Sequence, residues 1–264
     1  MIDTHCHLDA VLFDDDRARV LARARAAGVT DLVVPGVEPD GWDRLLELCR
    51  QDPGLHPAVG IHPQALPGLD PADDDRHLAD LEALLGRGGG AVAVGECGLD
   101  GPMEGAGAPM DRQRAVLRGH LDVARRRGLP VILHCLRAHD ALREELERDG
   151  IPFGGVLHSY SGSAEQVVAY ARLGLHFSFA GPVTWPAARR PLSAVKAVPL
   201  GRLLVETDAP DQTPHPHRGE RNEPARLPLV LGAVAAALGR PLDAVERATT
   251  ASARALFRLP AGAP

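Results

Sequence analysis

Eight short runs of apolar residues recur along the chain, separated by longer amphipathic stretches. The runs are rich in Val, Leu and Ile and carry few charges, which is typical of strands that are covered on both faces. They span residues 2–5, 31–37, 56–61, 91–95, 130–134, 155–158, 176–180 and 203–207. The stretches between them have helical spacing, as in residues 111–127, where apolar positions recur every three or four residues.

This alternation of strands and helices predicts a parallel sheet, and eight repeats favour closure into a (β/α)8 TIM barrel. The alternative is an open doubly wound sheet, but the chain contains neither a G-x-G-x-x-G nor a Walker A segment that would support it. No linker interrupts the alternation, so we expect residues 1–264 to form one domain. We expect residues 98–109 to form a loop after the fourth run. The Pro-rich residues 209–228 should form a longer loop after the eighth run, of the kind that is usually functional.

Composition narrows the class of protein further. The chain has no apolar run of about 20 residues and does not begin with a signal peptide, so we expect no membrane span. Its four Cys form no C-x-x-C pair, which indicates free thiols and a cytoplasmic location. The net charge of −6 disfavours a protein that coats polyanions, although it does not exclude a local nucleic-acid site. No feature points to an obligate protein partner.

Polar residues lie at the carboxyl ends of the predicted strands, which is where the active sites of barrel enzymes are found. A single His at such a position is more often a hydrogen-bonded structural residue than a ligand. Here, however, five separate strands each end in a residue that can bind a metal. Imidazole and carboxylate groups suit divalent ions, and six candidates exceed what one catalytic ion usually takes from protein. The predicted ligands of two ions, with Glu96 placed to bridge them, are His5, His7, Glu96, His134, His158 and Asp208.

The segments that carry these residues resemble the TatD family of metal-dependent deoxyribonucleases, within the amidohydrolase-like barrels. They are MIDTHCHLD, AVGIHP, AVGECGLD, LPVILHC, VLHSYSGS, LLVETDAP and RGERNEP, in order from Ile2 to about Phe257. The resemblance implies a TIM barrel with two metal ions. It places one ion on His5, His7, Glu96 and Asp208, and the other on Glu96, His134 and His158. It also implies Mg²⁺- or Mn²⁺-dependent hydrolysis of DNA, often from 3′ to 5′ on single strands.

The chain departs from the family pattern beside the fifth strand, where the family usually has Arg two residues after the His. Leu136 stands there and Arg137 follows it, which weakens the expectation of a phosphate contact at this point. The only Lys, Lys196, lies before the eighth run. Many amidohydrolase relatives bridge their metals with a carboxylated Lys after strand four, and that arrangement is excluded here.

We therefore predict a divalent-metal-dependent hydrolase that acts on phosphodiester bonds of DNA, with Mg²⁺, Mn²⁺ or Zn²⁺ as its two ions. Asp208 would take the proton of the attacking water and Glu96 would bridge the ions. His62, Arg221 and Asn222 are the predicted substrate contacts, and an ordinary surface role is the rival interpretation for Arg221.

Two other functions remain open at this point. The first is hydrolysis of a different bond at the same metal site. Such an enzyme would be an ester hydrolase such as a D-aminoacyl-tRNA deacylase, or a small-molecule amidohydrolase or lactonase. The other is a metal-binding or interaction protein without catalysis. The complete set of candidate ligands argues against this second alternative.

Overall fold

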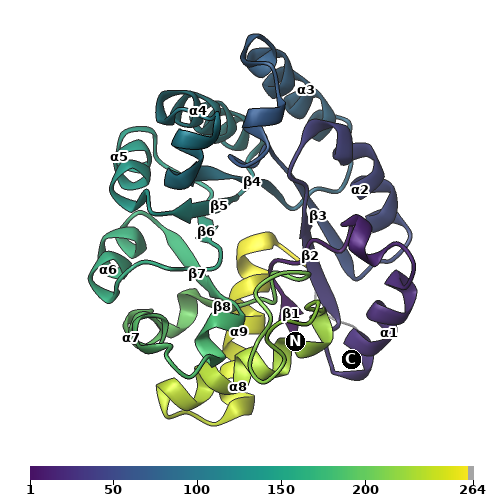
Figure 1. Cartoon of the computed structure of the whole chain (residues 1–264), viewed down its shortest axis with the longest axis vertical. Coiled ribbons are helices and arrows are strands. Elements are labelled where there is room, and N and C mark those ends of the chain that lie inside the picture. The colour runs from purple at the N-terminus through teal and green to yellow at the C-terminus, as the bar shows by residue number, and fades with distance from the viewer. Residues whose placement is uncertain (261–264) are drawn as a thin grey trace.

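The computed structural model describes residues 1–260 and contains one eight-stranded sheet in the order β1 to β8 (Figure 1). Every neighbouring pair is parallel. The strands are β1 Ile2–Asp3, β2 Asp31–Pro35, β3 Leu55–Val59, β4 Ala93–Asp100, β5 Val131–Leu136, β6 Gly155–Leu157, β7 Leu175–Phe179 and β8 Leu203–Val205.

Helices surround these strands, and all but the last form an outer layer, as Figure 1 shows. They are α1 Arg17–Ala26, α2 Trp42–Arg50, α3 Asp74–Gly86, α4 Met110–Arg127, α5 His139–Asp149, α6 Ala164–Arg172, α7 Arg189–Ala197, α8 Leu227–Leu238 and α9 Leu242–Phe257. The predicted helix over residues 111–127 matches α4 within one residue. Its apolar stripe is buried because Val116, Leu117, Leu121 and Ala124 all face the core.

A direct contact between the first and last strands closes the barrel. The backbone N–H and the hydroxyl of Thr4 both donate to the Val205 carbonyl, at 3.2 and 3.0 Å. Next to this contact, the buried Asp3 carboxylate accepts hydrogen bonds from the Thr207 backbone and hydroxyl. We call these residues the β1–β8 seam. The predicted (β/α)8 barrel is confirmed, and the alternative of an open sheet is wrong.

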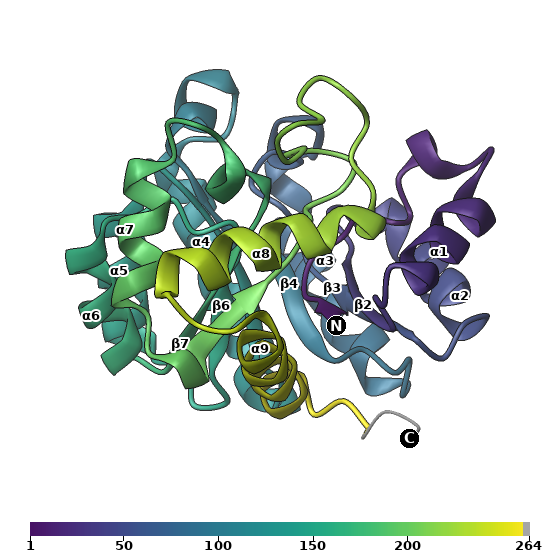
Figure 2. The ribbon, with the colours of Figure 1, turned by 90° about the horizontal axis from the view of Figure 1, so that it is seen from below.

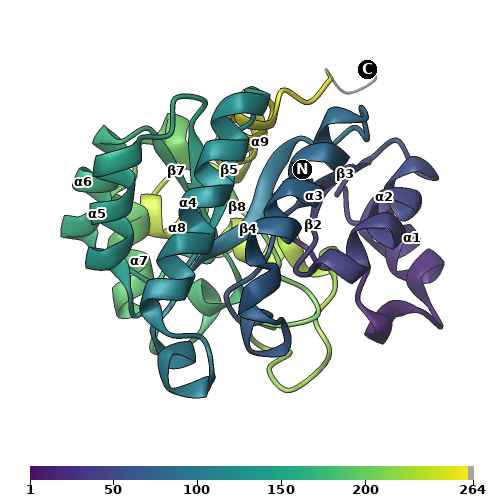
Figure 3. The same cartoon turned by 90° about the horizontal axis from the view of Figure 1, so that it is seen from above.

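Helix α9 covers the amino-terminal opening of the barrel. Its buried Ala253, Leu256 and Phe257 pack in one cluster with apolar residues from seven of the eight strands, among them Ile2 of β1 and Leu204 of β8. Figures 2 and 3 show α9 on the side opposite to the loops that follow β4 and β8. The amino-terminal end is therefore apolar and filled, which leaves the carboxyl end for polar groups.

Within residues 1–260, no single helix is long and apolar enough to cross a bilayer. One bent pair, Pro224–Leu238 with Leu242–Phe257, passes the same test on length and composition together, with a bend of 110°.

Strand β4 is longer than the sequence predicts, and the expected loop over residues 98–109 is wrong at its start. After a bulge beyond Val94, residues 97–100 pair with residues 133–136 of β5. Gly98 allows this pairing, because a Cβ at that position would lie 2.0 Å from the His134 carbonyl oxygen. A short 3-10 helix, η5 Gly101–Ala106, then leads toward α4. The extension carries Asp100 to the same end of the barrel as the predicted ligands.

Candidate metal centre

The six predicted ligands come together around the Glu96 carboxylate. Glu96 lies in β4, His134 lies in β5, and the others follow β1, β6 and β8 directly. All belong to the carboxyl ends of the strands, so the parallel sheet brings residues from five strands to one place. Their roles as ligands remain a prediction, but their convergence is a property of the structure.

The two oxygens of Glu96 face different imidazoles. Oε2 lies 3.1 Å from His5 Nε2 and 3.6 Å from His7 Nε2. Oε1 lies 3.1 Å from His134 Nδ1 and 2.7 Å from His158 Nε2. One carboxylate therefore joins two separate groups of nitrogen atoms, which is the arrangement needed to bridge two cations.

Asp208 completes the first of these groups. Its Oδ1 lies 3.6 Å from both His5 Nε2 and His7 Nε2, while its Oδ2 accepts a hydrogen bond from Gln212. The backbone holds the pair in place, because the Asp208 N–H donates to the His5 carbonyl at 2.9 Å. The side-chain oxygen of Gln212 is itself held by the Ser159 hydroxyl at 2.8 Å.

The charges of these buried groups depend on one another. Burial alone would raise the pKa of Glu96, but the imidazoles of His158, His62 and His5 outweigh it and hold the pKa well below its usual range. Burial likewise opposes protonation of His158, yet the adjacent Glu96 and Glu206 raise the pKa of that ring well above normal. At His5 burial dominates and lowers the pKa. Ionised carboxylates therefore lie beside imidazole rings whose pKa values are shifted in opposite directions.

Several observations fit a metal in this group. Among the described residues, the buried Oε2 of Glu96 accepts no hydrogen bond, so it keeps a free lone pair. The Nε2 atoms of His5 and His7 are only 3.2 Å apart. His7 Nδ1 lies 3.3 Å from the Pro35 carbonyl, and donation there would leave Nε2 of the neutral ring free to coordinate. The donor atoms are nitrogen and oxygen, which suits Zn²⁺, Mn²⁺ and similar ions.

His62, which the sequence predicts as a substrate contact, lies directly beside the Glu96 carboxylate. Its Nδ1 accepts a hydrogen bond from the Gln64 backbone at 3.0 Å, so the neutral ring carries its proton on Nε2. That Nε2 lies 2.9 Å from Glu96 Oε1 and donates to it. His62 thus orients the bridging carboxylate, and it also lines the cavity where a substrate would bind.

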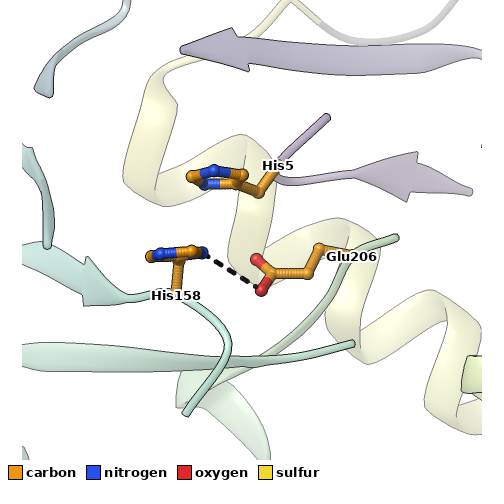
Figure 4. A group of neighbouring side chains, drawn as sticks. All are labelled: His5, His158 and Glu206. Atoms are coloured by element: carbon orange, nitrogen blue, oxygen red, sulfur yellow. Dashed lines mark ion pairs between the residues drawn. The ribbon is translucent and has the colours of Figure 1, made fainter. Parts of the chain in front are cut away.

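Sequence reasoning missed two buried carboxylates behind the imidazoles. Glu206 is fully buried and its Oε1 lies 3.6 Å from His158 Nδ1 (Figure 4). Asp100 Oδ2 lies 3.1 Å from His134 Nε2 and also accepts from Gln64 at 2.8 Å. Carboxylates in such positions fix the orientation of metal-binding imidazoles. Alternation could have revealed both, since Glu206 is two residues from Asp208 and Asp100 is four from Glu96.

The other two predicted substrate contacts lie apart from the metal group. The Arg221 guanidinium is bound to the Asp16 carboxylate, with both contacts at 2.8 Å, and to the Leu12 carbonyl. Asn222 is fully buried, and its amide donates to the carbonyls of Thr207 and Asp211. Both side chains therefore stabilise the loop after β8, and we do not include them in the proposed substrate site.

A cavity of about 420 Å³ opens onto the metal group, a volume within the usual range for small-molecule sites. One wall consists of predicted ligands, among them His7, Glu96 and His158. The rest of the lining is mostly apolar and comes from the ends of β5 and β7 and from the segments that follow β5, β6 and β7. Its residues include Leu136, Tyr160, Phe179, Pro182, Val183 and Pro191.

A second cavity, of about 410 Å³, lies on the other side of His7 and His62. Three carboxylates line it, from Asp9, Glu38 and Asp211. The two cavities adjoin each other at the metal group, where both contact His7, His62 and Asp211. We call the first the apolar cavity, for its larger apolar lining, and the second the acidic cavity, for Asp9 and Glu38.

A polar centre of this composition at the carboxyl end of a TIM barrel defines a metal-dependent hydrolase. A model of the family described as TatD related DNase matches residues 2–258. The chain belongs to this TatD family.

Relatives agree along almost the whole chain. The metal-dependent hydrolase YjjV of Escherichia coli is 36% identical over 260 residues, covering 98% of each chain. The 3′-5′ ssDNA/RNA exonuclease TatD of Salmonella typhimurium is 34% identical over 269 residues, covering 98% of this chain and 99% of its own. The crystal structure of Escherichia coli YjjV superimposes with a TM-score of 0.92 at 35% identity, again covering 98% of each chain.

Proposed function

We propose that this chain holds two divalent ions and hydrolyses phosphodiester bonds of single-stranded DNA, removing nucleotides from the 3′ end. The observation that carries the proposal is the division of the Glu96 carboxylate between two groups of imidazoles. Divalent ions held by these two groups would stabilise the attacking and the leaving oxygen of a displacement at phosphorus. The exonuclease name of the Salmonella typhimurium relative supports DNA or RNA as the substrate.

The predicted ligands form two sets, one for each ion. One ion would be held by His5, His7 and Asp208 and the other by His134 and His158, and Glu96 would contribute to both sites. Mg²⁺, Mn²⁺ or Zn²⁺ would supply the positive charge that lowers the pKa of a water and neutralises the phosphoryl oxygens.

Asp208 accepts the proton of the attacking water. Gln212 holds one oxygen of Asp208, so the other remains directed at the metal group. His62 stabilises the ionised form of Glu96 through its Nε2–H and faces the substrate from the mouth of the cavity.

The test is cleavage of a 5′-labelled single-stranded oligonucleotide with Mg²⁺ or Mn²⁺, and with EDTA as the metal-free control. We expect a ladder of products shortened from the 3′ end, which a phosphorothioate linkage at that end should block. Asp208→Asn keeps the shape of the side chain but removes the base, so the rate should fall by about 10²-fold or more. Asp140→Asn, at an exposed position in the first turn of α5, is the matched control. Equal rates for the two variants, or cleavage that persists in EDTA, would contradict the proposal.

The acidic cavity favours a second candidate, hydrolysis of an aminoacyl ester. An aminoacyl-tRNA carries an ammonium group beside its scissile ester, and Asp9, Glu38 and Asp211 offer it negative charge next to the metal group. Metal ions polarise a carbonyl as readily as a phosphoryl oxygen. Release of tyrosine from D-tyrosyl-tRNA, measured in parallel with DNA cleavage, separates the two candidates. Turnover of the ester alone would favour the second.

A further inference from the structure

Three Arg residues without charge partners lie on segments at the carboxyl end of the barrel, near the apolar cavity. Arg137 directly follows Leu136, and Arg190 directly precedes Pro191, so both adjoin residues that line the cavity. Arg218 lies on the loop after β8, above the Trp185 ring. All three side chains are exposed. Within residues 1–260 none of their guanidinium groups makes an ion pair or a hydrogen bond, so their charge is available to a ligand.

The opposite side of the mouth has the reverse character. There, Asp9 and Glu38 line the acidic cavity, and Asp211 lies where it adjoins the apolar one. Arg side chains are present on this side too, but each of them contacts a carboxylate. Arg17 and Arg44 both contact Asp14, and Arg221 contacts Asp16. A chain of phosphates would be repelled on this side and attracted on the other.

The two sides correspond to different parts of the barrel. Arg137 follows β5, Arg190 lies in the first turn of α7, and Arg218 lies on the loop after β8. Asp9 and Glu38 of the acidic cavity lie after β1 and β2, and the loop after β8 reaches both sides. Figure 1 shows β5 to β7 on one side of the barrel and β1 to β3 on the other. At the carboxyl end of the barrel, unpaired positive charge therefore lies toward β5–β7 and negative charge lies toward β1–β3.

The third Arg also offers a surface for a base. The Arg218 guanidinium carbon lies 4.2 Å from the centre of the Trp185 ring. The indole N–H donates to the Thr213 carbonyl at 3.1 Å, which fixes the ring. A guanidinium plane supported in this way can stack with an unpaired nucleobase of any sequence.

We propose that a single strand leaves the metal site across the β5–β7 side of the barrel, with phosphates beside Arg137 and Arg190 and a base on the Arg218–Trp185 stack. This inference rests on the proposed nuclease function and adds the path of the substrate to it. It also accounts for an acidic protein that acts on a polyanion, since the acidic surface lies off this path.

The experiment compares a double variant, Arg137→Gln with Arg190→Gln, against Arg172→Gln. Arg172 is also exposed and without a charge partner among the described residues, but it ends α6 at the far end of the barrel. Binding of a fluorescent single strand of about 12 nucleotides is measured by anisotropy in EDTA, so that no cleavage occurs. The same variants are then assayed for cleavage of this strand with Mn²⁺.

Each lost phosphate contact should weaken binding by about two- to five-fold, or about four- to 25-fold for the double variant. The slope of log K against log salt should become shallower by about 1.4, since each contact with a single strand contributes about 0.7. KM for cleavage should rise in proportion, and Arg172→Gln should behave as wild type. Arg218→Gln should weaken binding with a smaller change in the salt slope, because stacking is lost along with the charge.

Equal binding and equal salt slopes in the double variant and in Arg172→Gln would overturn the proposed path. A wild-type protein that binds the strand through these Arg residues but does not cleave it with any divalent ion would instead refute the nuclease function. The binding measurement therefore tests the path of the strand, and the cleavage measurement tests the nuclease function.

Discussion

Gly98→Ala should disrupt the pairing of β4 with β5 and move a predicted metal ligand. An ideal Cβ on Gly98 lies 2.0 Å from the His134 carbonyl oxygen and 2.8 Å from two further backbone atoms of that residue. An ordinary contact is about 3.5 Å, so the strands must separate by about 1 Å or more. Overpacking of this kind costs about 1–3 kcal/mol. The φ of 149° adds about 1–3 kcal/mol for any residue with a Cβ.

Gly98→Ala should therefore lower the free energy of unfolding by about 2–6 kcal/mol, measured by urea denaturation. The displaced atoms belong to His134, so Mn²⁺ affinity measured by calorimetry should fall as well. Gly105→Ala is the control, because a Cβ there meets nothing within 4 Å, and its effect should stay below about 0.5 kcal/mol. If Gly98→Ala costs no more than this control, the close approach of the two strands does not exist in solution.

Two further predictions concern buried carboxylates. Glu206→Gln should weaken the binding of Mn²⁺ or Zn²⁺ by about 10- to 100-fold, because Glu206 orients His158 from behind; unchanged affinity in a calorimetric titration would show that it does not. Glu145 is bound by three Arg side chains, whose hydrogen bonds lower its pKa to about 2. The stabilisation from this depressed pKa is complete above about pH 4.5, the unfolded value, and disappears as the pH falls through about 2. Glu145→Gln should thus cost about 1–2 kcal/mol at pH 7 and little near pH 2, whereas Glu147→Gln, which removes a partly exposed pair on the same helix, should cost less than about 0.5 kcal/mol at either pH. Urea unfolding of both variants at the two pH values checks this, and a cost for Glu145→Gln that does not change with pH would contradict it.

The fold was largely predictable because a parallel barrel repeats one simple pattern. Strands buried on both faces must be apolar throughout, and amphipathic helices must separate them. The same pattern fixes which end of each strand carries polar groups. For this reason the sequence alone predicts that four residues far apart along the chain come together, namely His5, Glu96, His134 and Asp208.

The parts that could not be predicted depend on contacts between elements. Gly98 looked like the start of a loop, since only the nearby β5 backbone shows why a glycine is needed within a strand. Arg221 and Asn222 had the chemistry of phosphate contacts, but their partners Asp16 and Thr207 are about 200 and 15 residues away in sequence. Composition alone does not indicate whether a guanidinium is already neutralised. The same difficulty concealed the free Arg residues around the apolar cavity.

The β1–β8 seam has a consequence for the synthesis of the protein. Asp208 N–H donates to the His5 carbonyl and His7 N–H donates to the Ala209 carbonyl, so the first and last strands hold each other's predicted ligands in position. A ribosome synthesises Asp208 about 200 residues after His5 and His7. No growing chain can assemble the complete metal group, because its two halves meet only when the last strand has emerged. A hydrolase built in this way gains its activity in a single late step, and fragments that end before β8 should lack it.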